Sequence, residues 1–401
     1  MNKFLLDSFL KYVKIDTMSM EGVDKTPSTD KQFNLAKVLV KDLEELGVKD
    51  IKLNEKCILT GVLPSNSNSK LHIGFIAHMD TIPGFSGTDV KPNIVNSYDG
   101  GIIKLKGIEL DPKAFPSLKN LKGKTLITTD GTTVLGADDK AGVANIIAML
   151  KYYQETNAPH VNIHIAFTPD EEIGGGIESF DVKNFGCDYA YTVDGGIYNE
   201  INYENFNAKS ITVNVHGLDI HPGDAKGKML NASRIAFEFD SLLSDSARPE
   251  YTEGYEGFNH LCEIKGEVGY AKMDYILRNH DKKLLEKQQN EFINARDFLN
   301  KKYNSNTIEL EINDSYSNMR ELIEKDDWCI KRAMEAIKAC GFPVKTSPIR
   351  GGTDGARLTQ MGLNTPNLGT GGYNCHGPYE FACLEEMENV VKILIEIAKE
   401  K

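Results

Sequence analysis

The sequence predicts an α/β protein in which a small α+β domain interrupts a larger one. Up to about Asn205, short apolar runs typical of buried strands alternate with amphipathic helical stretches. From there to residue 317 alternating strands and more charged helices follow, and after Asn318 the first pattern returns. We therefore expect a discontinuous domain of residues 1–205 and 318–401, with residues 206–317 inserted into it.

The larger domain begins with a predicted helix. The first stretch, MNKFLLDSFLKYVKID, carries charged residues inside its apolar pattern and no small-residue cleavage site, so it does not resemble a signal peptide. Residues 28–47 predict a second helix, with Thr29 and Gln32 as a capping box and Gly47 at its end. Residues 83–125, rich in Gly, Pro and Asn, predict an irregular excursion. The remaining expected elements are buried strands at 71–77, 161–168 and 188–194 and helices at 140–156, 326–340 and 384–399.

The inserted segment predicts six elements in the order β-α-β-β-α-β. Residues 210–217 alternate like a strand, and residues 229–243 have helical spacing. Two strand-like runs lie within 260–278. A charged helix at 281–300 and a strictly alternating strand at 307–314 complete the segment. This order is the split βαβ plan of a small separate domain.

Composition excludes several classes of partner. The chain has 401 residues, of which 58 are acidic and 46 basic, so its formal net charge is −12. The absence of a basic patch argues against nucleic acid as a partner. No apolar run approaches the ~20 residues that span a bilayer, so we expect no membrane span. The seven cysteines are scattered and never spaced C-x-x-C, which predicts a cytoplasmic protein without a disulfide scaffold.

Polar side chains collect where the predicted buried strands end. His78 and Asp80 follow the strand at 71–77. Residues i and i+2 of a strand point to the same side, so these two side chains can meet. A carboxylate on the second nitrogen of a metal-binding imidazole fixes its tautomer. The alternative for this pair is an ordinary polar strand end.

Acidic residues follow the same rule at three further places. Asp138 and Asp139, in GADDKAG, precede a predicted helix and can cap it. The alternative is that one of the two carboxylates binds a metal while the other caps the helix. The three consecutive acids in TPDEEIGGG (168–176) lie on a solvated loop or, if desolvated together, require cations. Asp194 ends the strand at 188–194, and His376 lies in a late glycine-rich loop.

The joint pattern indicates a ligand site. Open α/β sheets place ligands at the carboxyl ends of their strands, which is where these groups lie. The set combines two histidines with several carboxylates and contains no cysteine pair. Such donors suit a borderline metal such as zinc in a catalytic site.

The motifs HMDT, GADDKAG, TPDEEIG, TVDGG and CHGP occur in this order along the chain. Together they resemble the dinuclear zinc exopeptidase family, which includes glutamate carboxypeptidase, succinyl-diaminopimelate desuccinylase and a branch of tripeptide aminopeptidases. The phrase HPGDAKGKMLNA (221–232) is similar to that last branch. The resemblance covers nearly the whole chain. It implies a zinc-exopeptidase catalytic domain, with a mixed sheet between helices, and a ferredoxin-like lid domain over 206–317.

The resemblance also implies a set of site residues. Two zinc ions per chain would be bound, with cobalt or manganese as substitutes. Asp80 would orient His78, and Glu171 would be the general base that takes a proton from water. The branch usually has Asn where this chain has Asp139, which leaves open which aspartate bridges the ions. The implied metal ligands are His78, Asp138, Glu172, Asp194 and His376, with Asp138 in the bridging position.

Substrate contacts follow from looser matches to the family. His221 would donate to the developing oxyanion, and Arg350 beside GGTDG would hold a substrate carboxylate. Asn231 and Arg278 are further candidates, with purely structural roles as the alternative. The predicted protein is a cytoplasmic dizinc metallo-aminopeptidase, monomer or homodimer, that removes the amino-terminal residue from tripeptides. The alternatives are a related dizinc amidohydrolase, acting on dipeptides or N-acyl amino acids, and an inactive peptide-binding relative.

Overall fold

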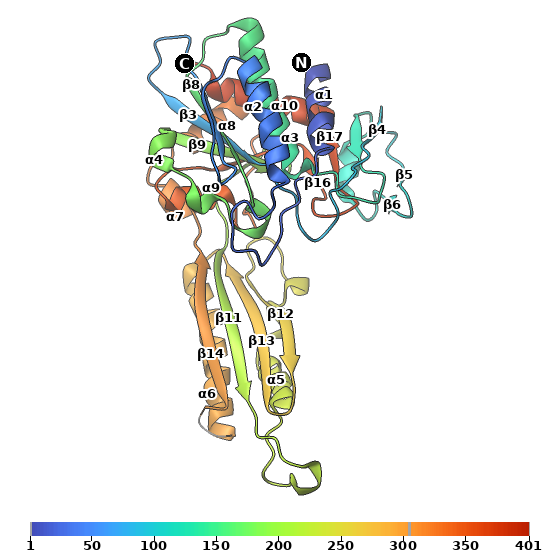
Figure 1. Ribbon diagram of the computed structural model, residues 1–401, viewed down its shortest axis with the longest axis vertical. Coiled ribbons are helices and arrows are strands. Elements are labelled where there is room, and N and C mark those ends of the chain that lie inside the picture. Colours follow the sequence, from blue (N-terminus) through green and yellow to red (C-terminus); the bar gives the residue numbers. More distant parts are fainter. Residues whose placement is uncertain (1, 304–305, 401) are drawn as a thin grey trace. The chain divides into compact units, whose positions relative to one another are not determined.

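The computed structural model describes residues 2–303 and 306–400 (Figure 1). The chain forms two compact units. The first contains Met1–Tyr203, Met319–Ser347 and Thr353–Lys401, and the second contains Glu204–Asn318 and Pro348–Gly352. The segment Pro348–Gly352 belongs to the second unit, whereas we expected all of residues 318–401 in the larger domain.

The first unit is built on a seven-stranded mixed sheet with the order β1-β2-β8-β3-β9-β15-β10. The central strand β3 pairs in parallel with β8 and β9, so the carboxyl ends of these three strands lie at the same edge. The predicted α/β class with a mixed sheet is confirmed. The strands are β1 Lys49–Leu53, β2 Leu59–Leu63, β3 His72–His78, β8 Asn162–Thr168, β9 Tyr189–Gly195, β10 Ile201–Asn202 and β15 Asn367–Gly369.

Helices pack on this sheet. Helix α3 is apolar almost all round because it contacts β3 and β9 as well as α1 and α10. Leu358 of α9 packs with Ile76 and Ala166 of the sheet. Within the described parts of the chain, no helix is both long and apolar enough to cross a membrane. The helices are α1 Asn2–Val13, α2 Gln32–Glu45, α3 Ala137–Thr156, α4 Val182–Phe185, α7 Arg320–Ile323, α8 Trp328–Ala339, α9 Asp354–Gln360 and α10 Leu384–Ala398.

The capping box predicted for α2 is wrong. The hydroxyl of Thr29 donates to the carbonyl of Met18 at 2.7 Å, and Gln32 Nε2 donates to Asp170 Oδ1 at 2.6 Å. Both side chains therefore fasten the start of α2 to distant parts of the chain instead of capping it. The predicted end is confirmed, since Gly47 has a positive φ of 81° and its N–H donates to a carbonyl of the last helical turn.

Residues 83–125 are less irregular than expected. They contain β4 Asn93–Val95 and the short pair β5 Ile103–Lys104 and β6 Glu109–Leu110. Strand β4 joins a second sheet, β16-β17-β7-β4, with β7 Leu126–Thr128, β16 Gly372–Tyr373 and β17 Phe381–Cys383. This sheet has a core of its own that includes Tyr98, Leu118 and Phe381. The prediction failed because strands of two or three residues are too short to show an alternating pattern.

The second unit has the predicted β-α-β-β-α-β order, and its strands are antiparallel in the order β12-β13-β11-β14. Ile211, Val213 and Val215 of β11 point to one face, where they pack with Phe239 of α5 and Phe292 of α6. Figure 1 shows these helices beside the long strands. The elements are β11 Asn207–His216, α5 Ala232–Ser241, β12 Phe258–Gly266, β13 Tyr270–Asn279, α6 Lys282–Lys302 and β14 Ile308–Tyr316.

Candidate metal centre

The side chains of His78 and Asp80 meet at the carboxyl end of β3. His78 is the last residue of the strand, and both side chains are buried. Asp80 Oδ1 lies 3.3 Å from His78 Nδ1. The Asp80 carboxylate also accepts the backbone N–H groups of Glu171, at 3.0 Å, and Glu172, at 3.2 Å. Asp80 therefore connects the segment after β8 to the imidazole at the end of β3.

Asp138 lies between two imidazole rings. Its Oδ1 is 2.9 Å from His78 Nε2, and its Oδ2 is 3.2 Å from His376 Nε2. Asp139 serves the backbone instead, accepting from His78 N–H and Gly142 N–H at 3.2 Å each. A Cβ at position 142 would meet the Val193 carbonyl oxygen at 1.8 Å, so only glycine lets the start of α3 come this close to β9.

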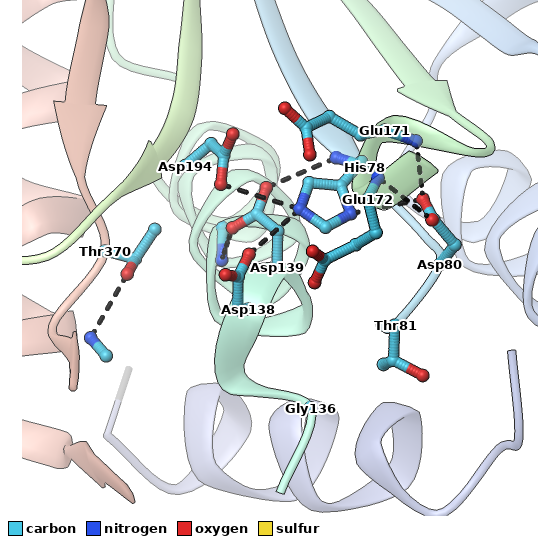
Figure 2. A network of polar contacts seen from close by, with 12 residues as sticks. His78, Asp80, Thr81, Gly136, Asp138, Asp139, Glu171, Glu172, Asp194 and Thr370 are labelled. Carbon is cyan, nitrogen blue, oxygen red and sulfur yellow. Dashed lines mark hydrogen bonds and ion pairs between the residues drawn. The ribbon is translucent and has the colours of Figure 1, made fainter. Parts of the chain in front are cut away.

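Two further carboxylates complete the cluster that Figure 2 shows around His78. Glu172 Oε2 lies 3.0 Å from His376 Nε2, and Asp194 Oδ1 lies 3.5 Å from His78 Nε2. The His376 side chain is 47% exposed, whereas that of Glu172 is 5% exposed. The cluster therefore has a solvent-facing side at His376. In the described parts of the chain, the Glu171 side chain stays outside these ion pairs.

The chemistry of these donors fits a bound metal. Ligand atoms of His78, Asp139 and Asp194 lie within 4.8 Å of one another, as do those of His78, Asp138 and Glu172. Imidazole nitrogen and carboxylate oxygen are donors that zinc accepts. The carboxylates outnumber the imidazoles, and buried negative charge of this kind needs cations to compensate it. The chain thus has two candidate metal-binding groups, and both include His78.

The pKa values reflect the same crowding of negative charge. Burial, followed by the charge of Asp194, raises the pKa of Glu171 well above its ordinary value. Burial also raises the pKa of Asp194 to about 6. For Asp138 burial acts in the same direction, but hydrogen bonds from His376 and His78 outweigh it and lower its pKa. A bound cation would favour the charged form of all three carboxylates.

Three of the predicted substrate contacts lie in the second unit and have partners there. His221 is exposed, and its Nδ1 accepts the N–H of Gly223 at 3.2 Å. Asn231 caps α5, because its Oδ1 accepts the N–H of Arg234 at 3.1 Å. Arg278 donates to two backbone carbonyls and lies over the ring of Tyr316. These contacts stabilise the unit itself.

Arg350 also belongs to the second unit. Its Nη1 donates to the carbonyls of Gly254 and Glu256 at 2.8 Å each, and its Nη2 donates to Thr252 Oγ1 at 2.9 Å. The guanidinium lies over the rings of Phe206 and Phe258. Much of its donor capacity therefore goes to the loop at 252–256.

Two buried acids near the cluster were not predicted as site residues. Asp170 accepts from Ser28 N–H at 2.7 Å and from its hydroxyl at 2.6 Å, and so anchors the segment before α2. The Asp354 carboxylate accepts from the hydroxyl of Thr168, the last residue of β8, at 2.8 Å. Burial raises the pKa of Asp354 to about 7. Asp170 stood in the run of three acids, but the sequence did not show that its partner would be Ser28.

Sequence comparisons place the chain among known proteins. The family model for peptidase family M20/M25/M40 matches residues 134–400. Peptidase T of Caldanaerobacter subterraneus subsp. tengcongensis is 50% identical over 400 residues, 98% of each chain. Peptidase T of Alkaliphilus oremlandii is 50% identical over 402 residues, again 98% of each chain.

Solved structures share the fold. A tripeptidase from Staphylococcus aureus matches with a TM-score of 0.80 at 21% identity, covering 100% of this chain and 98% of that one. The aminopeptidase PepT from Bacillus cereus matches with a TM-score of 0.78 at 22% identity, covering 99% and 98%. A dinuclear metal-binding peptidase of the M20 family from Bacillus subtilis matches with a TM-score of 0.65 at 14% identity, covering 99% and 97%.

Proposed function

Because the chain belongs to the peptidase family M20/M25/M40, we propose that it is a dizinc aminopeptidase that removes the amino-terminal residue from tripeptides. The name Peptidase T of its relatives supports the substrate class. The observation that carries the metal chemistry is the Asp138 carboxylate, which faces His78 with one oxygen and His376 with the other. A carboxylate placed in this way can serve two ions at once.

The two proposed ion positions share Asp138. His78 and Asp194 would complete one, and Glu172 and His376 the other. When bound, the ions would supply Lewis acidity to the scissile carbonyl and lower the pKa of the attacking water. Zinc suits these nitrogen and oxygen donors, and cobalt or manganese would use the same ones.

Glu171 is the proposed general base. It would take a proton from the attacking water and deliver it to the leaving amine. Its backbone N–H is held by Asp80, while its side chain stays outside the ion pairs that engage its neighbour Glu172. Asp80 would orient His78 through Nδ1.

We propose that the second unit is a lid domain that contributes residues to substrate binding. His221 is the proposed donor to the oxyanion, since it is exposed and its Nδ1 contacts only a neighbouring N–H, that of Gly223, among the described residues. Asn231, Arg278 and Arg350 enter as substrate contacts to be tested, because each already has partners within its unit. The seven cysteines are free, which supports the proposed cytoplasmic place of action. That the protein is a monomer or homodimer stays a prediction.

The substrate class is tested by comparing kcat/KM for alanine di-, tri- and tetrapeptides and for N-acetyl-alanine. We expect the tripeptide to be the best substrate and free alanine to leave from its amino terminus. A tripeptide with an acetylated amino terminus is the matched control and should be cleaved poorly. A preference for N-acetyl-alanine would contradict the proposal and indicate a deacylase, and a preference for the dipeptide would indicate a dipeptidase.

A further inference from the structure

Glu380 is a buried acid that joins two segments of the candidate site. It lies between His376 and β17, and its side chain is 1% exposed. Its Oε2 accepts the backbone N–H groups of Leu135, at 2.7 Å, and Gly136, at 2.8 Å. Its Oε1 accepts the N–H of Asp138 at 3.0 Å. One carboxylate thus accepts three backbone N–H groups, those of Leu135, Gly136 and Asp138, from the segment at the start of α3.

The second sheet places Glu380 at this position. Strand β17 pairs with β7, with Phe381 opposite Thr128, so the residue before β17 lies beside the segment after β7. That segment needs a left-handed residue at Gly136, whose φ is 76°. A turn of this kind points successive N–H groups toward one acceptor. Glu380 satisfies these donors where water is excluded, as buried N–H groups require.

We propose that Glu380 is a positioning residue that holds the Asp138 carboxylate between the imidazoles of His78 and His376. This inference rests on the proposed function, because Asp138 is the proposed shared ligand. Glu380 also follows His376 by four residues, so the same side chain ties the segment of one ligand to that of another. Through these bonds it sets the separation of the two segments.

The carboxylate is the side chain that these three donors require. Both of its oxygens accept, whereas the glutamine amide has one oxygen and an NH₂ group that can only donate. In Glu380→Gln, the NH₂ group would face either the N–H of Asp138 or those of Leu135 and Gly136. The substitution keeps the size of the side chain and removes at least one of the bonds, so the Asp138 backbone would shift.

The test measures zinc affinity. Wild type and E380Q, as full chains, are stripped of metal and titrated with zinc against a chromophoric chelator. We expect E380Q to bind zinc about 10–100-fold more weakly, the usual effect of removing a group that holds a ligand in place. The matched control is E385Q. Glu385 also accepts a backbone N–H, from Thr125 at 2.8 Å and 3.0 Å, but it does not touch the Asp138 segment. E385Q should bind zinc as wild type does.

The outcomes separate this inference from the proposed function. If wild type binds no zinc, the proposed function fails, and the inference falls with it. If wild type binds zinc and a folded E380Q binds it equally tightly, only the positioning role is overturned. Equal weakening in E380Q and E385Q would likewise overturn it, because a general loss of stability would then explain both.

A second variant covers the case in which E380Q does not fold. E380D keeps the charge but shortens the side chain, so its carboxylate cannot reach all three N–H groups at their present distances. We expect weaker zinc binding than in wild type and a lower kcat at saturating zinc with little change in KM. Zinc affinity equal to that of wild type in E380D would contradict the positioning role.

Discussion

The two units differ in how their polar residues are used. In the first unit, residues far apart in the sequence contact one another, as His78, Asp138 and His376 do. In the second unit, Asn231 bonds to the N–H of Arg234, and Arg278 bonds to carbonyls of its own sheet. Residue type alone would mark both sets as functional. At the candidate site, one carboxylate contacts imidazoles from two other parts of the chain, whereas Asn231 and Arg278 bond to backbone groups of their own unit.

The largest effect is expected at Asp138, because the contrast between the two units depends on its contacts with His78 and His376. Asp138→Asn should abolish stoichiometric zinc binding and turnover, because an amide lacks the second anionic oxygen that faces His376. Asp139→Asn is the matched control, since an amide oxygen can still accept from one N–H group. Zinc content and kcat of both variants are the measurements. Loss of zinc in D139N alone would reassign the shared ligand to Asp139.

Glu171 should matter for turnover and not for metal binding. Glu171→Gln removes the proton acceptor, so we expect kcat to fall by about 10²–10⁴-fold while zinc content stays unchanged. The control is Glu178→Gln in the same segment, an exposed residue paired with Arg357. Turnover of E171Q at the wild-type rate, or loss of its zinc, would contradict the separate roles of Glu171 and Glu172.

Arg350 tests whether the second unit carries a substrate contact. Arg350→Ala removes charged hydrogen bonds to the loop at 252–256, each worth about 1.5–3 kcal/mol, so the free energy of unfolding should fall measurably. If Arg350 only shapes this loop, KM should change by the same factor for a tripeptide and for its carboxamide. A rise in KM confined to the free carboxylate would instead make Arg350 a substrate ligand.

Asn231 should show the smallest effect. Asn231→Ala removes the cap of α5, which is expected to lower the free energy of unfolding by about 0.5–2 kcal/mol. Asn231→Ser retains a capping oxygen and should restore stability. Chemical denaturation and kcat/KM are measured on both variants. If N231S recovers stability but not kcat/KM, Asn231 contacts the substrate in addition to capping α5.

Regular elements could be predicted from sequence because their signal is periodic. The alternation in β11 and the continuous apolar run of β3 each predicted a strand that the structure contains. The small sheet containing β4 and β7 gave no such signal, because its strands are so short. The side chains of Thr29 and Gln32 matched a local motif but found partners outside it, which a local pattern cannot show.

The candidate site was predictable to the extent that its residues occur in motifs. His78, Asp138 and Glu172 lie in phrases that resemble a family, and they lie together in the structure. Glu380 and Asp170 were not predicted as site residues. The partners of Glu380 are backbone N–H groups more than 200 residues away. Residue types do not reveal such bonds, because every residue except proline has the same donor.

The central claim is that the cluster around Asp138 binds metal and that cleavage depends on it. The most direct test is elemental analysis of the purified protein, together with tripeptide cleavage before chelation, after chelation and after zinc is restored. We predict about two zinc ions per chain, cleavage that is lost with the metal and returns with it, and release of the amino-terminal residue. Cleavage by the metal-free protein at the full rate, or no stoichiometric metal after zinc is restored, would contradict this claim.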